Sequence, residues 1–318
     1  MRGRAMFVRA SYPWGRALAV VLGVPVVLVC AALVLAGCAG AGATNASAEV
    51  GSRSGERTLL IFAGAASKPP TEEIIELFET STGAKVEVNF GGSGSMLAEM
   101  EIAEQGDIYF PGSSDWMDVA AERGHVDPST VRRLVYLVSA INVQAGNPKG
   151  IESIEDLLRP DVRVVIANPE TVCVGAYAVE ILEKNLTPAE ARQFREANLV
   201  NWADSCEKTA NAISLKAADA VIGWGCFEDW DPQRIETVDF NPDELVRLAY
   251  IPIAVSSFAR DPDLAQEFIE FISSEQSMEI FRKYGYFADV AEAQAYVGAE
   301  ESLPLGGWYE VPDAWVVR

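Results

Sequence analysis

The stretch TLLIFAGAAS, residues 58–67, decides the fold. Its first five residues form a short apolar strand, and five small residues separate that strand from Lys68-Pro69-Pro70 and an amphipathic helix. The succession of strand, small-residue loop and helix occurs twice more, with strands at 85–90 and 105–110 and helices from about Met96 and Ser114. Three such units predict a parallel sheet covered by helices on both faces.

Two of these loops have the composition of an anion-binding turn. Ser67 closes the first loop, and Ser93 and Ser95 lie in the second, Gly91-Gly92-Ser93-Gly94-Ser95. A small-residue loop before a helix offers free backbone N–H groups, hydroxyl donors and the positive end of the helix dipole. Because serines also cap helices in many proteins without any ligand, the pattern by itself leaves both readings open.

The middle of the chain repeats this arrangement. A near-continuous apolar strand at 162–167 leads through residues 168–175 into a helix from Ala176 to Lys184, and residues 204–208 lead into a helix from Thr209 to Leu215. The chain then returns with a strand at 250–255 and a long helical region over 262–284. We therefore expect two lobes, residues 57–139 with 250–318 and residues 140–249, joined by two crossings that allow closure about a hinge.

The start of the chain predicts export. Four arginines without any acidic residue precede an apolar run that ends in Leu35-Ala36-Gly37-Cys38. This order is typical of a signal peptide, residues 1–37, and its end resembles the lipobox of bacterial lipoproteins. The resemblance implies lipidation of Cys38, and the Gly-, Ala- and Ser-rich residues 38–56 predict a flexible tether. An uncleaved membrane anchor is the alternative, since the run is long enough to span a bilayer.

The charge of the chain excludes several classes of partner. There are 25 basic and 46 acidic residues, and the predicted signal peptide would remove four arginines and no acid. So acidic a protein repels nucleic acid and anionic lipid. An anion ligand would have to be held by local dipoles.

Histidine and cysteine usage argues against an enzyme. His125 is the only histidine, no G-x-S-x-G sequence occurs, and nothing in the pattern directs His125 at a cysteine. Besides Cys38, the predicted mature chain has Cys173, Cys206 and Cys226. In an oxidising compartment two of these can pair, but the sequence alone does not assign the pair. A cation site is not expected, and neither is a cofactor.

Several ordered segments together resemble the periplasmic molybdate- and tungstate-binding proteins of ABC importers. They are IFAGAAS (61–67), FETSTGAKVEV (78–88), GDIY (106–109) with DWM (115–117), NPE (168–170) with GAYA (175–178), and FRKYGY (281–286). The resemblance covers about residues 57–287. It implies the two-lobed type II periplasmic binding fold, with a mostly parallel sheet in each lobe, and capture of a tetrahedral oxyanion for a membrane permease.

The resemblance also implies the binding residues. In that family neutral donors from both lobes hold the anion, and the matching positions are Ala66 or Ser67, Ser93 or Ser95, Val174, Cys206 and Trp224. This chain departs from the family pattern in three places. Ala65 and Ala66 stand where a serine hydroxyl is expected in the first loop, and Trp224 stands where the family has a tyrosine. The second lobe carries thiols at Cys173 and Cys206. If both thiols lie at the cleft, a disulfide between them could lock two helix N-termini together; two separate buried thiols are the alternative.

These observations predict a monomeric, lipid-anchored, extracytoplasmic component of an ABC importer that binds molybdate or tungstate. A binding protein for sulfate, phosphate or a thiosulfate-like anion, or a lipoprotein sensor, is the alternative. No function follows from residues 288–318.

Overall fold

The computed structural model describes residues 57–317. The predicted signal peptide, the predicted lipidation site Cys38 and the predicted tether lie outside the described residues. Among residues 57–317, no helix has both the length and the apolar character needed to cross a membrane.

The first lobe is built on a five-stranded sheet in the order β2-β1-β3-β10-β4. β1 pairs in parallel with β2 and β3, whereas β10 is antiparallel to β3 and β4. Four strands therefore run in one direction and β10 runs against them. The strands are β1 (Thr58–Gly64), β2 (Lys85–Gly91), β3 (Ile108–Phe110), β4 (Arg132–Leu137) and β10 (Ala249–Val255).

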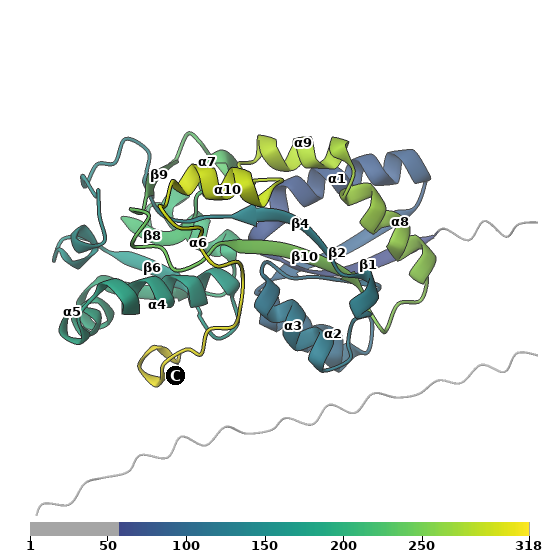
Figure 1. The fold of residues 1–318 in the computed structure, drawn as a ribbon, viewed down its shortest axis with the longest axis horizontal. Coiled ribbons are helices and arrows are strands. Elements are labelled where there is room, and N and C mark those ends of the chain that lie inside the picture. Colours follow the sequence, from purple (N-terminus) through teal and green to yellow (C-terminus); the bar gives the residue numbers. More distant parts are fainter. Residues whose placement is uncertain (1–56, 318) are drawn as a thin grey trace, which may run out of the picture. The chain divides into compact units, whose positions relative to one another are not determined.

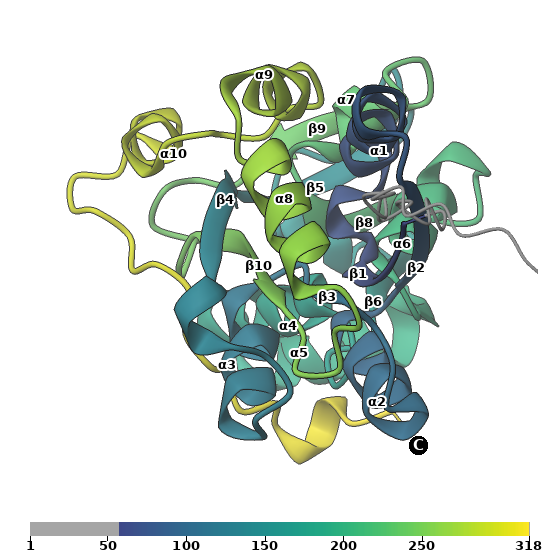
Figure 2. The same ribbon diagram turned by 90° about the vertical axis from the view of Figure 1, so that its right-hand side faces the viewer.

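Helices cover both faces of this sheet. α1 and α9 lie on one side, and α2 and α3 lie on the other (Figures 1 and 2). The helices of this lobe are α1 (Lys68–Thr82), α2 (Ser93–Ala103), α3 (Ser114–Glu122), α8 (Pro262–Ile272) and α9 (Glu275–Lys283). The helical region predicted over 262–284 is two helices, because the Ser274 hydroxyl caps α9 by accepting a hydrogen bond from Ser277 N–H.

The second lobe has the same plan. Its sheet has the order β7-β6-β8-β5-β9, and β5 runs against the other four strands. The strands are β5 (Ser139–Gln144), β6 (Val164–Ala167), β7 (Leu199–Ala203), β8 (Ala220–Trp224) and β9 (Ile235–Asp239). The helices are α4 (Cys173–Asn185), α5 (Pro188–Gln193), α6 (Cys206–Ser214) and α7 (Phe227–Trp230). The predicted two-lobed α/β fold with mostly parallel sheets is confirmed.

Strand alternation places a helix on each face of the second sheet. Val165 and Val221 pack with α6, whereas Val164 and Ile222 pack with α4. Both helices therefore begin at the carboxyl ends of parallel strands, which all meet at one edge of the sheet. Ligands of α/β sheets bind at that edge.

The two lobes are joined by short crossings. β4 ends at Leu137 and β5 begins at Ser139, so a single residue separates the two sheets there. The buried core also runs from one lobe into the other, since one cluster of packed side chains contains residues of both sheets.

The end of the chain differs from the predicted lobe assignment. Residues 250–318 are predicted to belong to the first lobe, but Ala293 of α10 (Val290–Val297) and Trp315 are buried in the core of the second. The Trp315 ring contacts the rings of Phe194 and Trp202, and this contact buries a large apolar surface. We call residues 298–317 the C-terminal strap. Figure 1 shows it running in yellow from α10 to the side of α4.

Candidate oxyanion-binding cleft between the lobes

Four helix starts or turns meet at one point between the lobes. They are the 3-10 turn η1 (Ala65–Ser67) and the first residues of α2, α4 and α6. Gly112 lies at the centre of the group, because a Cβ atom built on it would be 2.6 Å from Ala66 Cβ, 2.8 Å from Cys173 Sγ and 3.5 Å from Ser93 Oγ. Only a glycine fits where three segments approach so closely.

The first lobe provides one hydroxyl at this point. Ser93 is the first residue of α2, is buried, and accepts a hydrogen bond from Gly112 N–H at 2.9 Å. Ser67 is also buried, but its hydroxyl accepts a hydrogen bond from Thr71 Oγ1 in the first turn of α1, at 3.2 Å. Ser95 is exposed to solvent on α2. Of the two serines predicted in the second loop, Ser93 is therefore the one buried beside Gly112.

The second lobe provides two helix N-termini. Cys173 and Val174 begin α4, Cys206 begins α6, and all three are buried. The first N–H groups of a helix have no acceptor inside that helix, so both starts present donors. The two sulfur atoms are 3.9 Å apart and are not bonded to each other.

The lobes touch around these helix starts. Gly94 N–H of the first lobe donates to Thr171 O of the second at 2.9 Å. At the rim, Lys68 Nζ lies 2.7 Å from Glu207 Oε1 across the same boundary. The two lobes are therefore in contact around these helix starts.

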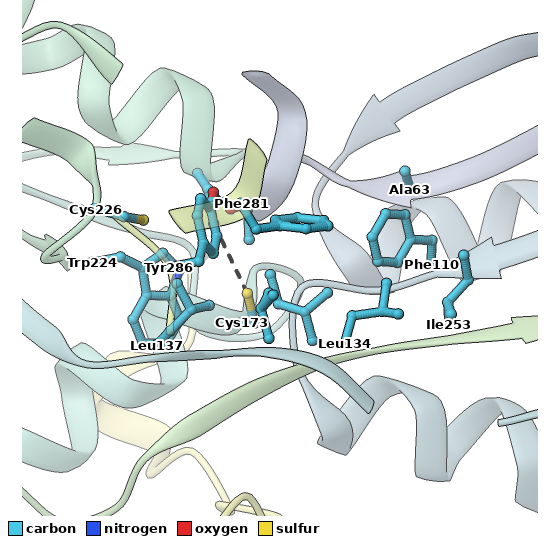
Figure 3. Packing of buried hydrophobic residues seen from close by; sticks show 14 of the residues in the cluster. Ala63, Phe110, Leu134, Leu137, Cys173, Trp224, Cys226, Ile253, Phe281 and Tyr286 are labelled. Atoms are coloured by element: carbon cyan, nitrogen blue, oxygen red, sulfur yellow. Dashed lines mark hydrogen bonds between the residues drawn. The ribbon is translucent and has the colours of Figure 1, made fainter. Parts of the chain in front are cut away.

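Trp224 ends β8 on the second-lobe side of the cleft. Its side chain is fully buried, and its Nε1 has no hydrogen-bond partner among residues 57–317. Its ring packs edge to face on Tyr177, with 5.1 Å between ring centroids. Figure 3 shows Trp224, Cys173 and Tyr286 in the part of the buried cluster where the lobes meet. A buried donor without an acceptor is costly, and a bound anion would supply the acceptor.

The electrostatics of the cleft favour an anion, although none of the predicted site residues carries a formal charge. Helices α2, α4 and α6 each direct the positive end of their dipole toward the meeting point, and the predicted site residues are all uncharged. Backbone N–H groups and helix ends of this kind bind oxyanions in many proteins. The geometry therefore suits a small anion held by hydrogen bonds from both lobes.

A charged cluster next to the cleft was not predicted from the sequence. The side chain of Arg247 is buried, its Nε is 2.7 Å from Glu180 Oε2, and its Nη2 is 3.8 Å from Asp115 Oδ2. The guanidinium also lies over the ring of Tyr177, at 4.0 Å from the centroid. Burial raises the pKa of Asp115, while Arg247 opposes that shift. In the sequence, this region is represented only by the segment DWM (115–117) of the family resemblance, which assigns no function to Asp115.

The comparisons with known proteins agree with the fold. The sequence profile of bacterial extracellular solute-binding proteins matches residues 59–287. A molybdate-binding protein of Mycobacterium bovis is 25% identical over 266 residues, which cover 80% of this chain and 94% of that protein. The predicted resemblance to the periplasmic molybdate-binding proteins is thus confirmed.

Solved structures share the two-lobed architecture. The periplasmic molybdate-binding protein of Azotobacter vinelandii matches with a TM-score of 0.63 and 14% identity, over 74% of this chain and all of that chain. The sulfate-binding protein of Mycobacterium tuberculosis matches with a TM-score of 0.67 and 17% identity, over 79% and 93% of the two chains. Because the profile covers most of the chain, this protein belongs to the family of bacterial extracellular solute-binding proteins.

Proposed function

We propose that this protein captures a tetrahedral oxyanion, molybdate or tungstate, in the interlobe cleft and delivers it to the permease of an ABC importer. The observation that carries the proposal is the convergence of η1 and the first residues of α2, α4 and α6 around Gly112. A tetrahedral anion has four oxygen atoms directed away from its centre, and donors that approach from both lobes can satisfy all four.

Capture follows from closure of the hinge. With the lobes apart, the anion meets the N–H groups of one lobe, and closure brings those of the other. Closure also excludes water, and a hydrogen bond to an ionised acceptor is stronger in such surroundings than in water. The donors Ser93 Oγ, Trp224 Nε1 and the N–H groups of Val174 and Cys206 hold the ligand.

Selectivity among oxyanions follows from the spacing of the donors. Molybdate and tungstate are larger than sulfate, so donors spaced for them would leave a smaller anion with longer and weaker hydrogen bonds. The sulfate-binding relative with the same fold makes sulfate the second candidate. Lipidation at Cys38 would keep the domain beside its permease.

Calorimetric titration tests the proposal. The full-length chain, purified in a non-ionic detergent, is titrated with molybdate, tungstate, sulfate, phosphate and thiosulfate. We expect molybdate and tungstate to bind with a Kd below about 1 μM and the other anions much more weakly. Binding of sulfate or phosphate at that affinity, with no heat from molybdate, would overturn the assignment of the ligand but not the oxyanion site.

A further inference from the structure

A cavity lies under the C-terminal strap, on the side of α3 and α4. Its volume is about 230 Å³. The residues that matter for its chemistry come from three parts of the chain: Asp115, Trp116, Glu170, Trp308, Tyr309 and Glu310. Drug-sized ligands occupy pockets of about 300–1,000 Å³, so this cavity has room only for a smaller molecule or for one polar group of a larger molecule.

Aromatic rings form part of the wall. Trp116 of α3 and Trp308 of the strap meet edge to face, with 6.2 Å between ring centroids. Tyr309 follows in the strap. Trp308 is 63% exposed, although a tryptophan side chain is among the costliest to leave in water. The faces of aromatic rings attract cations.

The charged groups at this cavity are mostly carboxylates. Glu170 and Glu310 are exposed at its rim, and Asp115 lies inside with only 3% of its surface exposed. Asp115 Oδ1 has no hydrogen-bond partner among the described residues. A buried carboxylate oxygen without a donor is unfavourable, so a ligand that donates to it or carries a positive charge would be stabilised.

Arg247 neutralises only part of this negative charge. Its guanidinium faces the other oxygen of Asp115, with Nη2 at 3.8 Å from Oδ2, and its Nε is bound to Glu180. One positive charge is thus shared between the buried Asp115 and the half-buried Glu180, and Glu170 and Glu310 add two more negative charges. The cavity therefore carries a net negative charge.

We propose that this cavity is a binding site for a small organic cation, such as a primary or quaternary ammonium group. The rings of Trp116, Trp308 and Tyr309 contact the alkyl surface of the cation, and Asp115 balances its charge. The site lies beside the oxyanion cleft but uses none of its proposed donors, since its walls are formed by α3, by Pro169, Glu170 and Ala176, and by the strap.

A pair of isosteric probes separates charge from size. The full-length chain in a non-ionic detergent is titrated with choline and, separately, with 3,3-dimethylbutan-1-ol, in which a carbon replaces the charged nitrogen. We expect saturable binding of choline and binding of the neutral alcohol that is at least tenfold weaker, about the range of a desolvated cation–π contact. Equal affinity for the two probes, or no saturable binding of choline up to ~50 mM, would overturn the proposal.

Matched variants locate the site. Trp308→Ala should weaken choline binding about 2- to 30-fold, whereas Trp308→Phe, which keeps an aromatic ring, should retain most of it. Because Trp308 is largely exposed, neither change should affect folding. Asp115→Asn should abolish the preference for choline over the alcohol. Unchanged choline binding in Trp308→Ala would place any cation site elsewhere.

The same samples keep this test apart from the proposed function. Molybdate titration of Trp308→Ala should match that of the unmodified chain, because Trp308 is outside the oxyanion cleft. Loss of choline binding with retained oxyanion binding supports the second site. Retained choline binding in a chain that binds no oxyanion would support it as well and would reject only the proposed function.

Discussion

The sulfur atoms of Cys173 and Cys206 lie 3.9 Å apart, each at the first residue of a helix. This contact joins the N-termini of α4 and α6 at the point where an oxyanion would bind. The neighbouring Cys206 thiol and burial together raise the pKa of Cys173 well above its usual range. Cys173 is therefore a protonated thiol at neutral pH.

The raised pKa of Cys173 predicts slow alkylation. Only the thiolate reacts, and a higher pKa leaves less thiolate at any given pH. At pH 8 we expect iodoacetamide to modify Cys173 at least tenfold more slowly in the folded chain than in urea, measured by mass spectrometry of the peptides. Equal rates in the two states would show that the cleft does not shield this thiol.

The same shift predicts a loss of stability in alkaline solution. A group whose pKa is higher in the folded than in the unfolded state stabilises the fold below the unfolded value, about 8.5 for cysteine, and this contribution is lost as the pH rises above it. Urea midpoints measured from pH 7 to 10 should fall less steeply for Cys173→Ala than for the unmodified chain. Parallel curves would contradict this prediction.

The disulfide between Cys173 and Cys206 stays a prediction. The two thiols would have to lose two hydrogen atoms to an oxidant, and their sulfur atoms would have to approach to about 2.05 Å. Mass spectrometry of the exported protein with and without reductant tests it. Free alkylation of both thiols in the unfolded, unreduced protein would rule the bond out.

Ser93 and Ser95 form a matched pair for testing the oxyanion cleft. Ser93→Ala removes a buried hydroxyl next to Gly112 N–H and should weaken molybdate binding about tenfold, the range of one hydrogen bond to a charged ligand. Ser95→Ala, which changes an exposed hydroxyl two residues later in the same helix, should leave the affinity unchanged. Calorimetry on both variants measures this, and equal losses would contradict the placement.

Gly112→Ala should prevent full closure of the cleft. The added Cβ would be 2.6 Å from Ala66 Cβ and 2.8 Å from Cys173 Sγ, so the lobes would have to move apart. We expect molybdate binding to weaken by at least tenfold, with a larger radius of gyration in the presence of ligand by X-ray scattering. Gly225→Ala is the control, since its Cβ would meet only Val138 O at an ordinary 3.7 Å.

Arg247→Met should be strongly destabilising. It would leave Asp115 and Glu180 without their shared guanidinium, and removing one partner of a buried ion pair costs about 3–5 kcal/mol. Arg282→Met provides the control, because Arg282 pairs with Glu275 and Glu279 at the surface and such pairs contribute about 0–1 kcal/mol. The free energy of unfolding in urea compares them, and a similar cost for both would mean that the Arg247 cluster is solvated.

The repeated strand and helix units could be predicted because their signals are local. The apolar strand at 58–62 and the small residues after it specify β1 and η1 whatever the rest of the chain does, and the parallel sheet follows from three such units. The choice between Ser93 and Ser95 could not be made this way. Residues two apart on a helix differ by roughly 200° in direction, so one faces the cleft and the other faces water, but the sequence does not say which.

Features that join distant segments could not be predicted. Asp115 and Arg247 lie far apart in the sequence, and neither stands in a pattern that identifies the other. The strand β5 could not be predicted because its buried Asn142 interrupts the apolar run, and the NH2 group of that side chain donates to Trp224 O and Thr237 Oγ1 of other strands. The packing of Trp315 on the second lobe likewise depends on Phe194 and Trp202, which only the folded chain brings near.

The C-terminal strap holds both lobes at once. Gly307 N–H donates to Ser114 Oγ of the first lobe, and Val317 N–H donates to Glu170 Oε2 of the second. Separation of the lobes with the strap held in this position would break at least one of these bonds. The residence time of a captured solute would then depend partly on the tail of the chain.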